Sequence, residues 1–164
     1  EAIEAFDYVQ NIAPDFYQLY LYRGISRWRI GDFAGAAKDL EKRVSYPPER
    51  EYDHIMLFLS KARSGGDGRK TLADFHGKSN NREWPEPVMS CVLGKSTPEG
   101  CIRAAGTGEK NAGRLCEADF YTGQWYLIKG DKDKAKEYFQ KAGDTGAADY
   151  LEYILSGLEM QRMK

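Results

Sequence analysis

The stretch LYRGISRWRIGDFAGAAKDLEK, residues 21–42, decides the fold, because its pattern returns 99 residues later as FYTGQWYLIKGDKDKAKEYFQK, residues 120–141. Each copy carries a Gly-Asp pair, Gly31-Asp32 in the first and Gly130-Asp131 in the second. Glycine adopts the left-handed backbone that ends one helix, and aspartate accepts a hydrogen bond from a free amide at the start of the next. Each copy therefore predicts two helices joined by a tight turn.

Small residues at matching positions indicate that the two helices of each hairpin pack closely. Gly24 and Gly123 fall within the first helix, and Ala36 and Ala135 fall within the second. Further repetition appears at a lag of 34 residues, where AIEAFDYVQNIAPD (2–15) aligns with AAKDLEKRVSYPPE (36–49). Since 99 residues is close to three such lags, the chain reads as a repeat array.

Composition limits the classes of function. The 164 residues carry 24 basic and 25 acidic side chains, for a net charge of −1, and 13% of them are aromatic. This balance argues against a strongly basic nucleic-acid binder and against a polybasic membrane-surface protein. We therefore expect no nucleic-acid partner. No stretch approaches 18 consecutive apolar residues, so we also expect no direct membrane span.

These residues resemble the tetratricopeptide repeat (TPR), a 34-residue helix–turn–helix. The best match is Cys116–Gly143, whereas the copy at 17–48 departs from the pattern at Arg23, Arg27 and Arg43. The resemblance implies an all-α fold, a TPR-like helical-hairpin solenoid with a right-handed superhelix, as a single domain over residues 1–164. Its expected parts are the second helix of a truncated repeat (1–14), a repeat (15–48), two degenerate central repeats (51–78 and 84–106), a repeat (116–143) and a C-terminal capping helix (145–162).

The second half also resembles the NlpI-like family of bacterial TPR lipoproteins. The residues that carry this resemblance include Trp84-Pro85, Leu93-Gly94-Lys95, Thr97-Pro98-Glu99, the run 117–123 and the helix at 150–160. The resemblance implies a protein of the bacterial cell envelope or periplasm that docks envelope proteases or peptidoglycan hydrolases, with a cytoplasmic location as the alternative. The chain starts with Glu1 inside a repeat, so we expect a trimmed or mature fragment, and this start is compatible with the removal of a leader or an N-terminal lipid anchor.

The TPR resemblance implies a binding site for a protein or peptide partner. In TPR proteins the first helix of each hairpin lines a concave groove. The groove candidates obtained by aligning the repeats are Leu21, Ile25, Trp28, Arg29, Met56, Arg63, Phe120, Gln124 and Leu127. The apolar stripe formed by Leu21, Ile25 and Trp28 either binds a peptide or is covered by another helix or a second subunit. The main alternative to an adaptor is therefore a self-associating structural subunit, such as a homodimer.

Catalytic and metal-binding patterns are weak, so we expect no enzyme, no catalytic residues, no metal and no cofactor. The two histidines, His54 and His76, belong to no metal-ligand spacing and are expected on helix surfaces. The run Gly94-Lys95-Ser96-Thr97 lacks the upstream glycine of a phosphate-binding loop. A metal- or Cys/His-dependent enzyme remains as a remote alternative.

Two further clusters leave alternatives open. Cys101 and Cys116 flank the predicted loop at 106–113, so they either form a disulfide or stay as two free thiols, and Cys91 is expected in the core. Arg23, Arg27 and Arg29 lie with Trp28 on one helix. They either bind an acidic peptide or extend from a packed face into solvent.

Overall fold

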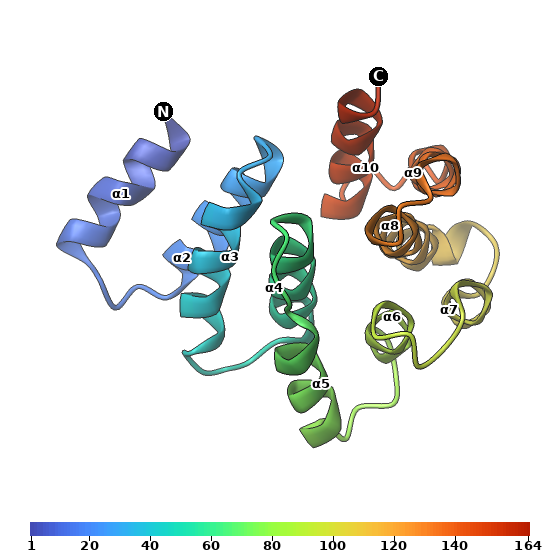
Figure 1. Cartoon of the computed structure of the whole chain (residues 1–164), viewed down its shortest axis with the longest axis horizontal. Helices are drawn as coiled ribbons and strands as arrows, with labels where there is room; N and C mark the ends of the chain where they lie inside the picture. The colour runs from blue at the N-terminus through green and yellow to red at the C-terminus, as the bar shows by residue number, and fades with distance from the viewer. The chain divides into compact units, whose positions relative to one another are not determined.

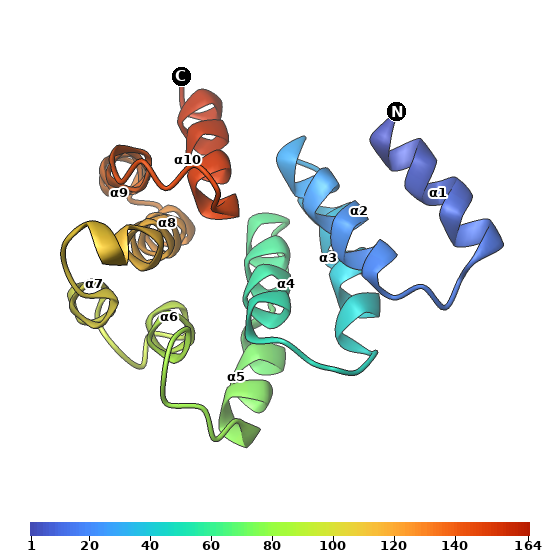
Figure 2. The same cartoon turned by 180° about the vertical axis from the view of Figure 1, so that it is seen from behind.

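A computed structural model describes all 164 residues, and they form ten α-helices and one 3₁₀ turn without any strand (Figures 1 and 2). The all-α prediction is thus confirmed, with helix packed on helix throughout. The chain divides into two compact units, Glu1–Ser79 (unit 1) and Asn80–Lys164 (unit 2). The expected single domain over residues 1–164 stays a prediction. No helix combines the length and the hydropathy that crossing a bilayer requires.

Unit 1 is a series of helices in which each packs on the next along the chain. The helices are α1 (Ala2–Ile12), α2 (Gln18–Arg29), α3 (Phe33–Val44), α4 (Glu51–Arg63) and α5 (Arg69–Lys78). Figure 1 shows α1 at one end of the series and α5 at the other. The helix α4 is buried along eight consecutive residues, 53–60, so it forms the centre of the unit's core.

The α2–α3 hairpin has the glycine turn, the aspartate cap and the close helix contact that its sequence predicts. Gly31 has φ +85°, the left-handed conformation that ends α2. The Asp32 side chain then accepts a hydrogen bond of 2.8 Å from the Gly35 amide and so caps α3. A β-carbon built on Gly24 would lie 3.2 Å from Leu40 Cγ, so the absence of a side chain there permits the close approach of α3.

Unit 2 repeats this construction around a longer helix. It contains α6 (Glu86–Val92), α7 (Pro98–Ala105), the 3₁₀ turn Glu109–Asn111, α8 (Ala112–Ile128), α9 (Lys132–Asp144) and α10 (Leu151–Arg162). Gly130 has φ +85°, and the Asp131 side chain accepts from the Lys134 amide at 3.1 Å. The α8–α9 hairpin therefore has the same turn and the same cap as α2–α3. The helix α8 also packs on α6, α7 and α10 and forms the centre of unit 2.

The last helix begins later than the sequence predicts. The capping helix is expected from residue 145, but α9 extends to Asp144 and α10 starts only at Leu151. Gly146 has φ +68°, and turn hydrogen bonds from Ala148 to Gly146 and from Tyr150 to Ala147 occupy the segment between them. The positive φ of Gly146 interrupts the helical path, and this is why the Asp144 and Thr145 positions do not start α10.

Candidate binding surfaces

Four of the nine predicted groove residues are buried and cannot contact a partner in this conformation. Trp28 is 0% exposed because its ring packs edge-on against Phe33, with the Arg63 guanidinium above it. Phe120 is equally buried and contacts the ring of Phe139. The other two buried candidates are Met56 and Gln124. These four predictions are corrected: the residues are core residues, because apolar side chains at helical spacing also describe a packed face.

The remaining candidates leave one continuous surface on α2. Leu21 and Ile25 are half-buried and Arg29 is exposed. Between them lies Tyr22, whose side chain is 52% exposed. We call these four residues, at positions i, i+1, i+4 and i+8 of one helix, the α2 face. Tyr22 was not among the residues predicted from the sequence, although an aromatic residue three positions before Ile25 belongs to the same helical stripe. The two other candidates, Arg63 and Leu127, are half-buried elsewhere.

The arginine cluster of α2 is occupied by carboxylates of the same chain. Arg23 is buried and pairs with Asp39 at 2.6 Å and with Asp7 at 2.7 Å. Hydrogen bonding to Asp39 raises the pKa of the Arg23 guanidinium further. Arg27 pairs with the second Asp39 oxygen at 3.0 Å. These two arginines therefore join α1, α2 and α3, and neither extends into solvent as one reading of the sequence expected.

Arg43, the third departure from the TPR pattern, also makes buried polar contacts within unit 1. Its side chain is 2% exposed and lies 3.0 Å from Asp53 Oδ2. It donates to the carbonyl oxygens of Tyr46 and Pro48, both at 2.9 Å. These bonds tie the end of α3 to the α3–α4 connection and to α4. Arg23 and Arg43, which depart from the TPR pattern, therefore form buried ion pairs that hold adjacent helices together.

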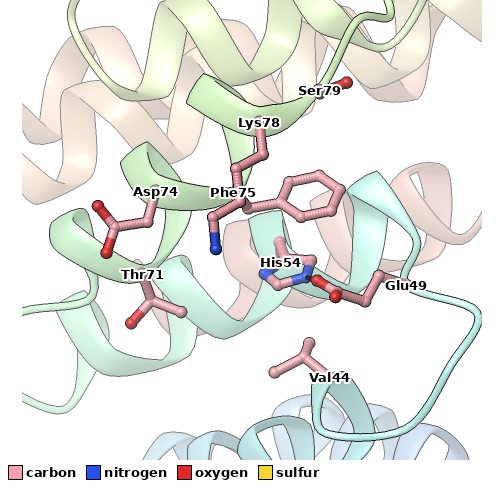
Figure 3. Close-up of a pocket in the computed structure, with 8 residues that line it drawn as sticks. All are labelled: Val44, Glu49, His54, Thr71, Asp74, Phe75, Lys78 and Ser79. Atoms are coloured by element: carbon pink, nitrogen blue, oxygen red, sulfur yellow. Dashed lines mark hydrogen bonds and ion pairs between the residues drawn. The ribbon is translucent and has the colours of Figure 1, made fainter.

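A cavity of about 480 Å³ opens in unit 1 between α4, α5 and the α3–α4 connection (Figure 3). His54 and Phe75 stack in its wall, with ring centroids 3.9 Å apart and planes 15° from parallel. The edge of His54 meets Glu49, with Nε2 2.9 Å from the carboxylate oxygen Oε2. Burial lowers the pKa of His54, although Glu49 opposes that shift. The expectation that His54 lies on a helix surface is wrong, because the packing of α5 covers it.

A second cavity lies in unit 2 between α9 and α10 and has a volume of about 420 Å³. Its lining residues are Phe139, Gln140, Gly143, Tyr153, Gly157, Met160, Gln161 and Lys164. A β-carbon on Gly143 or Gly157 would meet no atom within 4 Å, so two glycines leave part of the wall open.

All three cysteines are free and buried, and the structure places the Cys101 thiol beside that of Cys91. A hydrogen bond with Cys91, together with burial, raises the pKa of the Cys101 thiol. Burial raises the pKa of Cys116 to about 12, while a hydrogen bond with Thr145 opposes that shift. The free-thiol alternative thus describes this structure, and Cys91 lies in the core as predicted.

Unit 2 also buries several carboxylates that the sequence pattern did not single out. Glu152 accepts a 2.8 Å hydrogen bond from the Tyr121 hydroxyl, and Glu117 accepts one from the Trp84 indole. Burial and the nearby charge of Glu117 raise the pKa of Glu152. Burial alone raises the pKa of Asp119 to about 6, opposed by Lys141. No group of three or more His, Cys, Asp or Glu side chains is arranged to hold a metal ion.

A scan against models of known protein families finds no match to this chain.

Proposed function

We propose that the protein is a non-catalytic, TPR-like scaffold that binds a protein or peptide partner through the α2 face. We further infer that its hairpins stack as a right-handed TPR superhelix. The support is the recurrence of one construction: the pairs Gly24–Leu40 and Gly123–Phe139 meet in the same way, 99 residues apart. The same turn and the same aspartate cap recur with them.

The observation that carries the binding proposal is the composition of the α2 face. Tyr22 is half exposed beside Leu21 and Ile25, and Arg29 is exposed one turn further on. Tyrosine and arginine are enriched among the residues that dominate the energy of protein interfaces. Because α2 is held on both sides by α1 and α3, this surface is preformed, and a preformed surface loses little conformational entropy on binding.

The proposed class of partner rests on the resemblance to NlpI-like proteins. That resemblance favours envelope proteases or peptidoglycan hydrolases, and with them a place in the bacterial cell envelope. We propose this placement as the first to test. Capture of a cytosolic partner would support the scaffold function and contradict the proposed location in the cell envelope.

The proposal is tested by a cross-linked pull-down from the source organism, with the captured proteins identified by mass spectrometry. We expect the wild-type chain to enrich a defined partner and Tyr22→Ser to lose it. Tyr8→Ser is the matched control, because Tyr8 is also an exposed tyrosine of unit 1, on α1 and outside the α2 face. Equal enrichment by all three proteins would contradict the α2 face as the binding surface.

A second candidate function, self-association, is favoured by α1. This helix buries none of its residues, and Tyr8 and Ile12 are 66% and 65% exposed on one side of it, followed by Phe16. An exposed apolar stripe of this kind is typical of an interface. Light scattering should then report a dimer that dissociates in Ile12→Asp. A wild-type chain that stays monomeric at high concentration would exclude this candidate.

A further inference from the structure

One side of α10 is open where this helix packs beside α9 (Figures 1 and 2). Tyr153, Gly157, Met160 and Lys164 line the cavity of about 420 Å³ between the two helices. They stand at positions i, i+4, i+7 and i+11, the spacing of residues that share one face of a helix. Tyr153 and Met160 are half-buried, whereas Gly157 and Lys164 are exposed, so another molecule can reach them. We call these four residues the α10 face.

The centre of the α10 face has room for side chains that the chain itself does not supply. A β-carbon built on Gly157, or on Gly143 across the cavity in α9, would meet no atom within 4 Å. At Gly24 and Gly123, by contrast, the second helix of the hairpin occupies that space. Beside the α10 face, Ile154 is also 41% exposed. A hollow bordered by exposed apolar side chains is typical of an interface.

The α10 face is complementary to a second copy of itself. The centre of α10 falls between Ser156 and Gly157, and Tyr153 and Met160 are equally far from it on opposite sides. When two α10 helices meet face to face and antiparallel, a two-fold axis passes through this centre. Each Tyr153 ring then lies against the Met160 side chain of the other copy. A thioether beside an aromatic ring is a favourable contact, and the symmetry makes it twice.

The charges at the two ends of α10 favour the same arrangement. Asp149 lies two residues before the first residue of α10, Lys164 lies two residues after the last, and both are exposed. An antiparallel second copy places Asp149 of each chain opposite Lys164 of the other, whereas a parallel copy brings like charges together. One exposed ion pair at each end adds little affinity, but complementary charges select the orientation.

We propose that the α10 face is an interface for a second copy of this chain, formed by antiparallel packing of α10 against α10. Both copies contribute the same residues, so the assembly closes as a dimer. The interface shares no residue with the α2 face or with the exposed stripe of α1. It therefore goes beyond the proposed partner binding, and each surface can fail without the others.

The oligomeric state of the full chain tests this interface. Sedimentation velocity from low to high protein concentration should report a monomer–dimer equilibrium for wild type. Gly157→Leu should abolish the dimer, because the added side chain fills the place of the second copy. The variant should still fold, since the chain has room at this position and leucine is a better helix former than glycine.

Gly77→Leu is the matched control for Gly157→Leu. Gly77 is an exposed glycine within α5, and a β-carbon there would likewise meet no atom within 4 Å. This variant should dimerise as wild type does. Tyr22→Ser should also keep the dimer, which separates failure of the α10 face from failure of the α2 face.

A pair of charged variants tests the antiparallel contact itself. Tyr153→Glu and Met160→Lys each bring an unpaired charge into the interface, so each should stay monomeric alone. Mixed in equal amounts, they should form a heterodimer. The introduced carboxylate of one chain then meets the introduced ammonium of the other, and the second Tyr153–Met160 contact is unchanged. A loss of dimer through misfolding would not be restored by mixing.

Three results would overturn the proposal. The first is a wild-type chain that stays monomeric at the highest concentration. The second is a wild-type dimer that persists in Gly157→Leu, and if that dimer dissociates in Ile12→Asp, self-association belongs to α1. The third is the absence of a heterodimer when Tyr153→Glu and Met160→Lys are mixed, because the antiparallel contact requires it.

Discussion

Phe139 of α9 lies directly over Gly123 of α8: a β-carbon built on Gly123 would come within 2.7 Å of Phe139 Cε1 and 2.8 Å of Cδ1. It would also lie 3.2 Å from the Ala135 carbonyl oxygen, which belongs to the backbone and cannot turn away. The equivalent contact in unit 1 is looser, because a β-carbon on Gly24 would lie 3.2 Å from Leu40 Cγ. The same glycine contact thus occurs in both hairpins, and it is closer in α8–α9 than in α2–α3.

Replacing these glycines should therefore destabilise unit 2 more than unit 1. Gly123→Ala should lower the free energy of unfolding by about 1–3 kcal/mol, because the added methyl forces α8 and α9 apart. Gly24→Ala should lower it less, since Leu40 can shift its flexible side chain. Urea denaturation followed by circular dichroism measures both changes.

Gly157 provides the matched control for the two hairpin glycines. It lies within α10, and a β-carbon there would meet no atom within 4 Å. Gly157→Ala should raise the free energy of unfolding by about 0.5–1 kcal/mol, the usual difference between the two residues in a helix. If Gly123→Ala is as stabilising as Gly157→Ala, the close contact between α8 and α9 is wrong.

Asp119 should make the stability of the protein depend on pH. Burial raises its pKa to about 6 from an ordinary value of 3.8, and the residue as a whole is 7% exposed. The folded protein therefore holds this proton more tightly than the unfolded chain does. The contribution of protonated Asp119 to the free energy of unfolding is therefore fully present below about pH 4. It is lost as the pH rises through about 6 and the carboxyl group ionises.

Asp119→Asn should remove the loss of stability that ionisation of Asp119 causes above about pH 6. At about pH 7.5 the variant should be more stable than wild type by about 1–3 kcal/mol, and at about pH 3.5 the two should be equal. Asp149→Asn changes an exposed aspartate of the same unit and should have little effect at either pH. A variant that loses stability at neutral pH would show that the Asp119 carboxylate is stabilising when charged.

The cysteine arrangement predicts which disulfide an oxidant can form. Because the Cys91 and Cys101 thiols share a hydrogen bond, mild oxidation with diamide should join these two. Peptide mapping under non-reducing conditions identifies the pair, and Cys91→Ser should abolish it. Recovery of a Cys101–Cys116 bridge would restore the pairing considered from the sequence and contradict the placement of α6 on α7.

Local signals in the sequence predicted local structure well. Asp32 and Asp131 were each expected to cap a helix, and each accepts a hydrogen bond from an amide three residues on. The signal for such a cap is contained within four residues, so it can be read without knowledge of the fold. The start of α10 was missed because Gly146 could have continued a helix or broken it, and the sequence alone does not set its φ.

Long-range pairings were beyond the sequence. Arg23 and Asp39 are sixteen residues apart and meet only because α3 folds back on α2. His54 likewise stacks on Phe75, which is contributed by α5 and lies 21 residues further along the chain. A helical stripe also does not reveal which of its residues a neighbouring helix will cover, and for this reason Trp28 was assigned to the surface while Tyr22 was overlooked.

The most direct test of the account is site-specific photo-crosslinking from the α2 face in cells of the source organism. The full chain would carry p-benzoyl-phenylalanine in place of Tyr22 or, separately, in place of Tyr8. The account predicts a discrete cross-linked species from position 22 that is absent from position 8 and that mass spectrometry identifies as a second protein. Cross-linking from position 8 alone, or only to a second copy of this chain, would contradict the scaffold and favour self-association through α1.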